Sequence, residues 1–524
     1  MLKPVQASSY TLRDILENGF LYVDKTRYVY DLVRPGKGVY FLARPRRFGK
    51  SLMISTLDEV FRGNRELFAG LWIDESDYEW QRHPVIRIDF SRHQIRTVAD
   101  LEVRIQRHLS QIAEQYGVVL VDAPFDIQLE DLILKLAATK QVVILIDEYD
   151  KPILDNIDRL DEAIRIRDTL KSFYSTLKAL DASIRFVFIT GVSKFSKVGV
   201  FSAMNNLDDL TMDPRFAAAL GITEEELTRD FRAHLAHFAD QEGITSADLL
   251  EKIRHWYDGF RFAAAGPSLY NPFSTLQLFN KRYFSNFWFE TGTPTFLVQL
   301  LKERQYDIQP LDHLEVPELA FSAYEIESLD LIPLLFQTGY LTIKDFRRDQ
   351  FGEIYTLAYP NAEVRGSFLT HLLSAYNQIE VTLSEGYLRR LLYALNQQEL
   401  PQFFAILDVL FANIDPSINS GHRYDLQVNH EKYYQTIFYL IFLLLGVRVA
   451  AEVKTNQGRI DAVVELDQRI FLFEFKLDGS ADEALAQIVH TEYHRKYQLH
   501  GKPITLIGAN FDSRQRKIGE WKSQ

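Results

Sequence analysis

The stretch at residues 39–51, VYFLARPRRFGKS, constrains the fold more than any other part of this sequence. A short β-branched and aromatic run leads into a basic loop, and the residues after Lys50 carry apolar side chains at helical spacing. This order of strand, loop and helix predicts a phosphate-binding P-loop. In such a loop, backbone N–H groups face the phosphate oxygens, the lysine reaches the terminal phosphates and the next hydroxyl binds Mg²⁺. The predicted nucleotide contacts are Arg47, Gly49, Lys50 and Ser51.

One position of this loop departs from the general motif. Where G-x-x-x-x-G-K-S has its first glycine, this chain has Arg44, and Pro45 biases Arg44 toward an extended conformation. A tetrapeptide such as FGKS also occurs by chance in a solvated turn between a strand and a helix. Nucleotide binding therefore needs support from a second feature.

Residues 141–150, QVVILIDEYD, supply that second feature. The apolar run predicts a buried parallel strand that ends in Asp147 and Glu148, and buried carboxylates are costly unless they are paired or bind a metal. In a P-loop NTPase, Asp147 would hold Mg²⁺ and Glu148 would polarise the attacking water. A third strand at residues 184–189 ends in Thr190, a candidate sensor of the γ-phosphate. The alternative is that these acids face solvent and that Thr190 only favours a turn.

The alternation of elements predicts the fold of this first part. Residues 85–90 and 184–189 have strand patterns, while residues 101–116 and 161–180 have apolar side chains at helical spacing. Further helices are expected at residues 223–238 and 247–256. Strands alternating with helices indicate an α/β fold, with a mostly parallel sheet, helices on both faces and the nucleotide at the carboxyl ends of the strands.

Length and composition limit the alternatives. A chain of 524 residues exceeds one core, so two or three domains are expected, and the absence of cysteine excludes disulfides and thiolate chemistry. The first ten residues have no apolar core for a signal peptide, and the apolar run at 437–445 is too short to span a bilayer. We therefore expect a cytoplasmic protein with no membrane partner. The formal net charge of −12 requires any nucleic-acid surface to be local.

Seven segments read together add a family resemblance. YVDKT, RPRRFGKS, LIDEYDKP, FVFITGVSKFS, NNLDDLTMDPRFAAALGIT, HWYDGFRF and YNPFS, in one continuous order, resemble the AAA-ATPase-like family of bacterial and archaeal proteins. That family begins its P-loop with the same arginine-proline pair, so Arg44 fits the family. The resemblance implies ATP and Mg²⁺ as cofactors. We expect this domain at residues 1–280 and a mainly helical connecting region at residues 281–412.

A second chemical centre lies near the C-terminus. Residues 458–479, GRIDAVVELDQRIFLFEFKLDG, predict a hairpin whose loop is Asp467-Gln468. Opposed positions then add to 935, so Asp461 lies across from Glu474 with Cβ atoms about 5 Å apart. Lys476 projects from the same face as Glu474. This pattern places two acids and one lysine together.

Two acids opposite each other destabilise a sheet unless a cation lies between them. An Asp and a Glu that share Mg²⁺, beside a lysine, suit phosphodiester hydrolysis, because the metal polarises the phosphate and activates water. The alternative is an amphipathic hairpin whose charged residues form a solvated face. The same face also carries Val463, Ile470 and Leu472, which a solvated face would not need.

The wider C-terminal part, at residues 413–524, resembles the PD-(D/E)XK nuclease superfamily, an α/β restriction-endonuclease-like fold. The segments that carry this resemblance are the helix from Glu431, VRVAAEV, GRIDAVVEL, IFLFEFK, the helix with Gln487 and ITLIGANF. It implies catalytic positions for Asp461, Glu474 and Lys476, with Asp461 and Glu474 as metal ligands and Glu431 and Gln487 as accessory residues. Residues 494–524 carry seven Lys or Arg against two acids, which suits a phosphate backbone or a solvated tail.

The two centres together predict an ATP-binding and ATP-hydrolysing protein coupled to Mg²⁺-dependent cleavage of nucleic acid, with DNA as the expected substrate. The competing hypothesis is a non-cleaving nucleotide switch that binds nucleic acid or a protein partner through an inactive nuclease fold. A homo-oligomer is consistent with either, because P-loop ATPases can complete their sites with an arginine from a neighbour.

Overall fold

The computed structural model describes residues 2–92, 94–194, 204, 206–288, 295–304, 306–321, 330–350, 352–412, 430–446, 450–456, 459–490, 494–512, 515 and 517–524. Within these ranges, the side chains of residues 295–296, 303, 319, 430–435, 450–461 and 496 are not described. The chain divides into two compact units. Unit 1 comprises Met1–Thr293 and Leu311–Glu363, and unit 2 comprises Pro294–Pro310 and Val364–Gln524.

The centre of unit 1 is a parallel sheet. Within the described residues its strands follow the order β2-β3-β4-β1-β5, and every pairing is parallel. The strands are β1 (Gly38–Ala43), β2 (Val85–Asp89), β3 (Val142–Asp147), β4 (Ile184–Gly191) and β5 (Asp208–Asp209). All six residues of β3 are buried, as its continuous apolar run predicts. The predicted parallel α/β sheet is confirmed.

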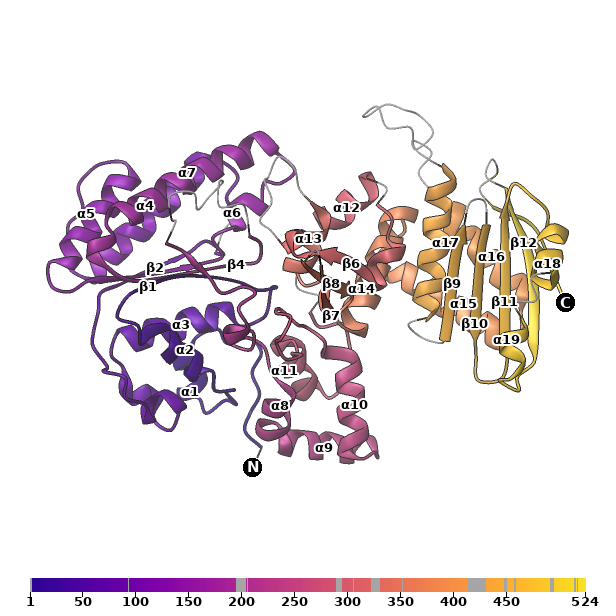
Figure 1. Cartoon of the computed structure of the whole chain (residues 1–524), viewed down its shortest axis with the longest axis horizontal. Helices are drawn as coiled ribbons and strands as arrows, with labels where there is room; N and C mark the ends of the chain where they lie inside the picture. Colours follow the sequence, from indigo (N-terminus) through magenta and orange to yellow (C-terminus); the bar gives the residue numbers. More distant parts are fainter. Residues whose placement is uncertain are drawn as a thin grey trace. The chain divides into compact units, whose positions relative to one another are not determined.

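Helices cover both faces of this sheet (Figure 1). One group packs below the sheet in that view and the other above it, and the apolar residues at helical spacing point inward. The first group is α1 (Leu12–Glu17), α2 (Thr26–Val33) and α3 (Lys50–Phe61), followed by the short helices η1 (Arg65–Phe68) and η2 (Trp72–Glu75). The second is α4 (Val98–Gln115), α5 (Phe125–Ala137), α6 (Lys151–Leu154) and α7 (Leu160–Ala179), with η3 (Asp181–Ser183).

The helix expected at residues 223–238 is two helices. Thr223 and Glu226 form the predicted capping box at the start of α8 (Glu224–Asp230), but that helix ends at Phe231, where α9 (Arg232–Glu242) begins. Phe231 is fully buried in the core that α8 and α9 share with α10 and α11. Packing of this ring thus coincides with the change of helix direction. The neighbouring helices are η4 (Pro214–Phe216), α10 (Ser246–Tyr257) and α11 (Pro272–Lys281).

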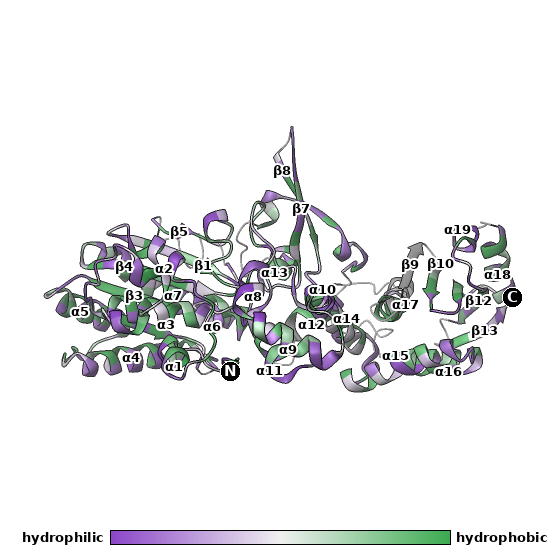
Figure 2. Cartoon of the chain, turned by 90° about the horizontal axis from the view of Figure 1, so that it is seen from below, coloured by the Kyte–Doolittle hydropathy of each residue, from purple (hydrophilic) through white to green (hydrophobic). Residues whose placement is uncertain are grey.

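The expected connecting region contributes a small sheet to unit 1. Its described strands, β6 (Leu314–Pro317), β7 (Thr342–Asp349) and β8 (Gly352–Ala358), pair in the antiparallel order β6-β8-β7. The β7–β8 hairpin projects from its surroundings (Figure 2), and β7 is exposed from Lys344 onward. Three short helices accompany the sheet: η6 (Gln309–Asp312), η7 (Glu318–Phe321) and α13 (Leu331–Gln337).

Unit 2 holds the C-terminal sheet. Its described strands follow the order β13-β12-β11-β10-β9, with β11 and β12 parallel and the other pairs antiparallel. They are β9 (Ala450–Asn456), β10 (Arg459–Glu465), β11 (Ile470–Leu477), β12 (Ile504–Asp512) and β13 (Lys517–Ser523). The helices are α12 (Thr295–Glu303), α14 (Ala362–Asn377), α15 (Val381–Asn396), α16 (Leu400–Ala412), α17 (His430–Gly446), α18 (Ala481–His490) and α19 (Arg495–Gln498).

Aromatic side chains fill the core between the helices and this sheet. Phe403 stacks on Phe473, and Phe438 packs against Phe475 and Phe511 at centroid distances of 4.6 and 5.6 Å. The apolar run at residues 437–445 is buried in α17, as expected. No helix in the described ranges is both long and apolar enough to cross a membrane. The expected domain limits at 280 and 412 stay predictions.

Candidate nucleotide and nuclease sites

The predicted P-loop joins β1 to α3. Gly49 has a φ of 93°, a left-handed conformation that favours glycine, and α3 begins at the next residue. Lys50 is 4% exposed, and its ammonium donates hydrogen bonds to the carbonyls of Arg44 and Pro45, each at 3.0 Å. Burial lowers the pKa of Lys50, and the charge of Glu148 opposes that shift. The loop thus holds a cation at the start of a helix, as phosphate binding requires.

Arg44 fastens the beginning of this loop. Its buried guanidinium donates to the carbonyls of Ala43 and Thr211, each at 2.8 Å, and to that of Phe216 at 3.2 Å. The guanidinium also lies over the ring of Phe262, 4.3 Å from the centroid. Burial lowers its pKa to about 9. The arginine in place of the usual glycine therefore points away from the nucleotide side and ties the loop to residues far along the chain.

The acids at the end of β3 meet the end of β4. Asp147 is 1% exposed and accepts a 2.7 Å hydrogen bond from the hydroxyl of Thr190. Glu148 follows with a φ of 51°, which is uncommon for a residue with a side chain. Burial raises the pKa of Glu148, and Lys50 opposes that shift. The structure thus brings Lys50, Asp147, Glu148 and Thr190 to one edge of the sheet, although the hydroxyl of Thr190 contacts Asp147.

A cavity of about 560 Å³ opens at this edge. Gly49, Lys50, Ser51 and Glu148 line one part of it. The rest is mainly apolar, and its walls come from the N-terminal residues and from the region of α8 and α11: Ile15, Leu21, Val23, Val29, Leu220, Ile222 and Leu276. A cavity with a polar end and an apolar remainder is typical of small-molecule sites.

Arg47, a predicted nucleotide contact, closes one wall of this cavity. Its guanidinium lies 4.6 Å from the ring centre of Phe273 and 5.9 Å from that of Tyr10, and it donates a hydrogen bond to the Tyr10 hydroxyl. Contact of Arg47 with phosphate stays a prediction. Sequence reasoning missed Tyr10 and Phe273, because they lie far from the P-loop in the chain. Phe273 lies in YNPFS, one of the segments that carry the family resemblance, whereas Tyr10 lies in none of them.

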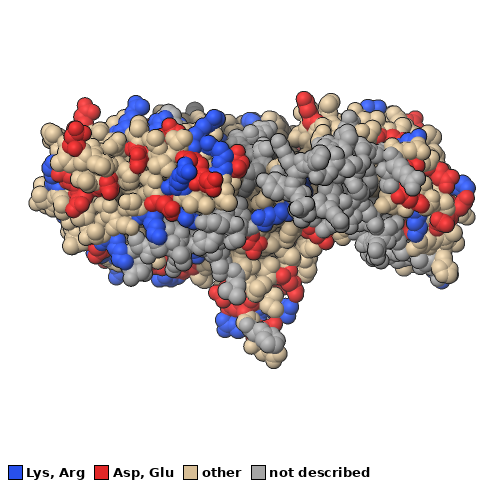
Figure 3. Space-filling model, turned by 90° about the horizontal axis from the view of Figure 1, so that it is seen from above, with Lys and Arg blue, Asp and Glu red and all other residues tan. Residues whose placement is uncertain are grey.

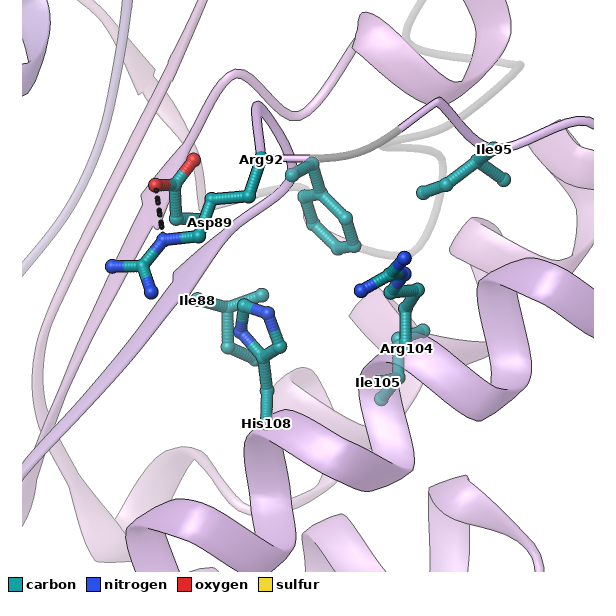
Figure 4. Close-up of a pocket in the computed structure, with 8 residues that line it drawn as sticks. Ile88, Asp89, Arg92, Ile95, Arg104, Ile105 and His108 are labelled. Atoms are coloured by element: carbon teal, nitrogen blue, oxygen red, sulfur yellow. Dashed lines mark hydrogen bonds and ion pairs between the residues drawn. The ribbon is translucent and has the colours of Figure 1, made fainter.

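A second cavity lies beside the end of β2 (Figure 4). Asp89, Arg92, Arg104 and His108 line it, and Arg92 pairs with Asp89 at 3.2 Å. Burial lowers the pKa of His108, and the charge of Arg92 adds to that shift. At about 10 Å³ the cavity has room for roughly one water molecule. It is too small for a substrate.

The C-terminal hairpin has the predicted register. Asp461 pairs with Glu474 across β10 and β11, and the ladder runs from Glu465↔Ile470 to Arg459↔Lys476. Val463, Ile470 and Leu472, on the face of Glu474, are buried. A solvated hairpin face is therefore wrong for this sheet. The side chains of Asp461 and Glu431 lie outside the described part of the structure.

Glu474 is buried in unit 2, and the partly exposed Lys476 lies beside it. Glu474 is 2% exposed, and its carboxylate is 3.4 Å from the Lys476 ammonium. Lys476 also donates a hydrogen bond to the side-chain oxygen of Gln487 on α18. The structure therefore brings together three of the residues selected from the sequence.

Gly508 allows the backbone of α18 to approach β12 closely. It is the β12 partner of Glu474, and a Cβ atom there would lie 2.5 Å from the carbonyl of Ala481 and from the amide of Leu485. Glycine is required because backbone atoms of α18 occupy that space. The close contact places Gln487 over the strand that carries Lys476.

Several C-terminal cations have acidic partners. Lys502 pairs with Glu465 at 2.9 Å, and Lys522 pairs with Asp482 at 2.5 Å. On the face drawn in Figure 3, the described Lys and Arg residues are intermixed with Asp and Glu. The described side chains include no group of three acids or histidines arranged to hold a metal, but Asp461 is outside that set.

The fold and these sites define the class: a P-loop ATPase-like unit joined in one chain to a nuclease-like sheet domain. A family model described as a predicted AAA-ATPase matches residues 6–201, and a model of the PD-(D/E)XK nuclease superfamily matches residues 429–521. The protein of Azotobacter chroococcum mcd 1 known as "Uncharacterized protein in vnfD 5'region" is 39% identical over 506 residues, 95% of this chain and 94% of that protein. The chain belongs to the AAA-ATPase-like family and carries a C-terminal domain of the PD-(D/E)XK nuclease superfamily.

A solved structure, the Walker-type ATPase paby2304 of Pyrococcus abyssi, covers 70% of this chain and 97% of its own. It is 11% identical, with a TM-score of 0.33. A score at that level supports no conclusion about this chain.

Proposed function

We propose that unit 1 binds and hydrolyses ATP with Mg²⁺. Support comes from the buried Lys50 at the start of α3 and from Glu148 on the wall of the same cavity. Ser51 and Asp147 would hold the metal, which neutralises charge on the phosphates when bound. Lys50 would exchange the loop carbonyls for phosphate oxygens, and Glu148 would orient the attacking water.

The apolar part of the cavity would receive the base and ribose. A nucleotide needs a polar end for its phosphates and an apolar end for its base, and the 560 Å³ cavity offers both. Tyr10 and Phe273, whose rings flank Arg47, lie on this wall. Their flat faces suit stacking on a base.

We propose that unit 2 cleaves phosphodiester bonds of nucleic acid with Mg²⁺, and DNA is the expected substrate. The observation that carries this proposal is Glu474, which is 2% exposed, lies beside Lys476 on one strand and pairs directly with Asp461 on the next. Burying a carboxylate is costly, and the partly exposed Lys476 at 3.4 Å offsets only part of that cost, so a buried Glu474 favours a chemical use. Asp461 and Glu474 would hold the metal, which activates water when bound, and Lys476 would stabilise the charge that develops on the phosphate.

A non-cleaving nucleotide switch is the second candidate. The pairing of Lys502 and Lys522 with acids favours it, because fewer cations are then available for a phosphate backbone. In this alternative, unit 2 binds nucleic acid or a protein without cleaving, and ATP controls that binding. Location in the cytoplasm and assembly into an oligomer stay predictions.

The test is cleavage of plasmid, linear duplex and single-stranded DNA, and of RNA, with Mg²⁺ and with or without ATP. The informative variants are Lys476→Ala and Lys50→Ala. Matched controls are Lys522→Ala and Lys37→Ala, whose lysines form surface pairs with Asp482 and Asp181. Loss of cleavage in Lys476→Ala but not in its control Lys522→Ala would support the nuclease.

Dependence of cleavage on ATP and on Lys50 would support coupling of the two sites. Cleavage that proceeds equally without ATP and in Lys50→Ala would contradict the coupling but leave the nuclease in place. Lys50-dependent ATP hydrolysis without cleavage of any substrate would favour the switch.

A further inference from the structure

Glu148, the residue proposed to orient the attacking water, has a backbone conformation that contacts of neighbouring residues must stabilise. Its φ of 51° lies in the left-handed region, which residues with a side chain rarely adopt. Such a conformation persists only where the surrounding structure fixes it. The contacts of the next residues along the chain therefore decide where Glu148 points.

Asp150 makes the largest set of these contacts. One of its carboxylate oxygens accepts hydrogen bonds from the amide of Val192 at 3.0 Å, the amide of Ser193 at 2.7 Å and the hydroxyl of Ser193 at 2.6 Å. Asp150 is 1% exposed, and Ser193 is fully buried. A side chain two residues after Glu148 thus binds the segment that follows β4 and Thr190.

Tyr149 also joins the end of β3 to the end of β4 and the residues that follow it. Its amide donates to the carbonyl of Thr190 at 3.0 Å, and its hydroxyl donates to the carbonyl of Ser193 at 3.0 Å. Gly191 fits between them because a Cβ there would lie 2.6 Å from the Asp150 carboxylate and from the Tyr149 ring. The strand ends that carry Asp147, Glu148 and Thr190 are therefore held at one spacing.

We propose that Asp150 is a positioning residue, which fixes Glu148 in its working geometry by accepting hydrogen bonds from the amides of Val192 and Ser193 and from the hydroxyl of Ser193. This inference rests on the proposed ATP hydrolysis. The buried carboxylate of Asp150 is bound by Val192 and Ser193, and Asp150 does not line the nucleotide cavity, so it acts through its neighbours. Nucleotide binding, which depends on Lys50 and the P-loop, does not require the Asp150 contacts.

The test compares Asp150→Ala with Asp150→Asn. Alanine removes the acceptor, so kcat for ATP hydrolysis should fall between about 10- and 100-fold while KM and the Kd of a fluorescent ATP analogue stay within about threefold. Asparagine keeps an oxygen where the three donors meet, and it should restore most of kcat. The control is Asp100→Ala, which also removes an acceptor of two backbone amides, those of Arg96 and Thr97, but at the start of α4.

A double variant separates positioning from general damage. If Asp150 acts through Glu148, adding Asp150→Ala to Glu148→Gln should lower kcat by no more than about twofold, since the group it positions is already gone. Multiplying losses, or a parallel loss of ATP affinity in Asp150→Ala, would overturn the proposal. So would an Asp150→Asn variant as impaired as Asp150→Ala, because the contact geometry would then not be the cause.

Hydrogen exchange gives a readout that needs no hydrolysis. Asp150→Ala should speed amide exchange in residues 142–151 and in residues 184–194 and leave residues 50–56 unchanged. If the wild-type protein hydrolyses no ATP, the proposed function fails, and this exchange pattern still decides whether Asp150 joins the two strand ends. Exchange unchanged in residues 184–194 would overturn the proposal by itself.

Discussion

Replacing Arg44 tests whether a buried arginine can substitute for the first glycine of a P-loop. Each of its three hydrogen bonds to carbonyl groups joins a charged donor to a buried acceptor, and such bonds contribute about 1.5–3 kcal/mol each. Against this, burial lowers the guanidinium pKa to about 9, which corresponds to a cost of roughly 5 kcal/mol for keeping the charged side chain in the folded protein. The arginine therefore stabilises unit 1 by a small difference between two large terms.

Two substitutions, Arg44→Met and Arg44→Lys, test this balance, and we expect the lysine variant to lose more stability. Arg44→Met fills much of the space and buries no charge, but it removes the guanidinium donor from the buried carbonyl of Thr211, so we expect a loss of about 2 kcal/mol. The carbonyl of Phe216 keeps its hydrogen bond from the amide of Ala219. Arg44→Lys still buries a charge, and a single ammonium cannot reach three carbonyls and stack on Phe262, so we expect a loss of about 3–5 kcal/mol. The chemically similar residue should be the more damaging one.

Thermal unfolding with and without ATP is the assay. The first transition should fall by about 4–8 °C in Arg44→Met, at roughly 2–4 °C per kcal/mol, and by more in Arg44→Lys. Arg215→Met is the matched control, because the side chain of Arg215 is 74% exposed, and it should change the transition little. A lysine variant more stable than the methionine variant, or a methionine variant equal to wild type, would refute the reasoning.

Three further predictions concern other residues. Gly508→Ala should destabilise unit 2 by about 1–3 kcal/mol in urea unfolding and weaken cleavage, because the new Cβ would meet the α18 backbone, whereas Gly386→Ala, with open space around it, should be harmless. Burial raises the pKa of Glu148 above the usual 4.5, so the carboxylate gains a proton, and ATP hydrolysis should begin to fall, before the pH has dropped to 4.5. A kcat that stays constant down to pH 4.5 would argue against Glu148 as the base. Glu226→Gln should cost about 3–5 kcal/mol at pH 7, since it leaves the buried ammonium of Lys25 without its carboxylate. Burial already lowers the pKa of Lys25, so the folded state loses this proton before the unfolded state does, and the variant should regain stability as pH rises toward 10.5; urea unfolding at pH 7 and 9 checks the sign.

The sequence predicted those parts of the structure that depend on local pattern. Alternating apolar runs gave the strands and helices of the first sheet, and hairpin arithmetic placed Asp461 across from Glu474. Both rest on periodicities that side-chain direction imposes on a strand or helix. The helix expected at residues 223–238 was wrong at Phe231, where two helices meet and the ring is buried in the core that they share.

The remaining features depend on contacts between distant residues. The contacts of Arg44 with Thr211 and Phe216, and those of Asp150 with Ser193, join positions more than 40 residues apart. No periodicity encodes such contacts, since they follow from how the sheet brings its strand ends together. The apolar wall of the nucleotide cavity was missed for the same reason.

The path of the chain restricts how this protein can be divided. Unit 1 consists of two segments of the chain, Met1–Thr293 and Leu311–Glu363, because Pro294–Pro310 belongs to unit 2. Hydrogen bonds from Arg261 to Thr342 and from Asn361 to Asp258 join these two segments. The carbonyl of Pro360 also lies where a Cβ of residue 259 would be. A single cut in the gene therefore cannot release either half with its core complete. Recombination that exchanges only one end of the gene would therefore leave unit 1 or unit 2 without one of its segments.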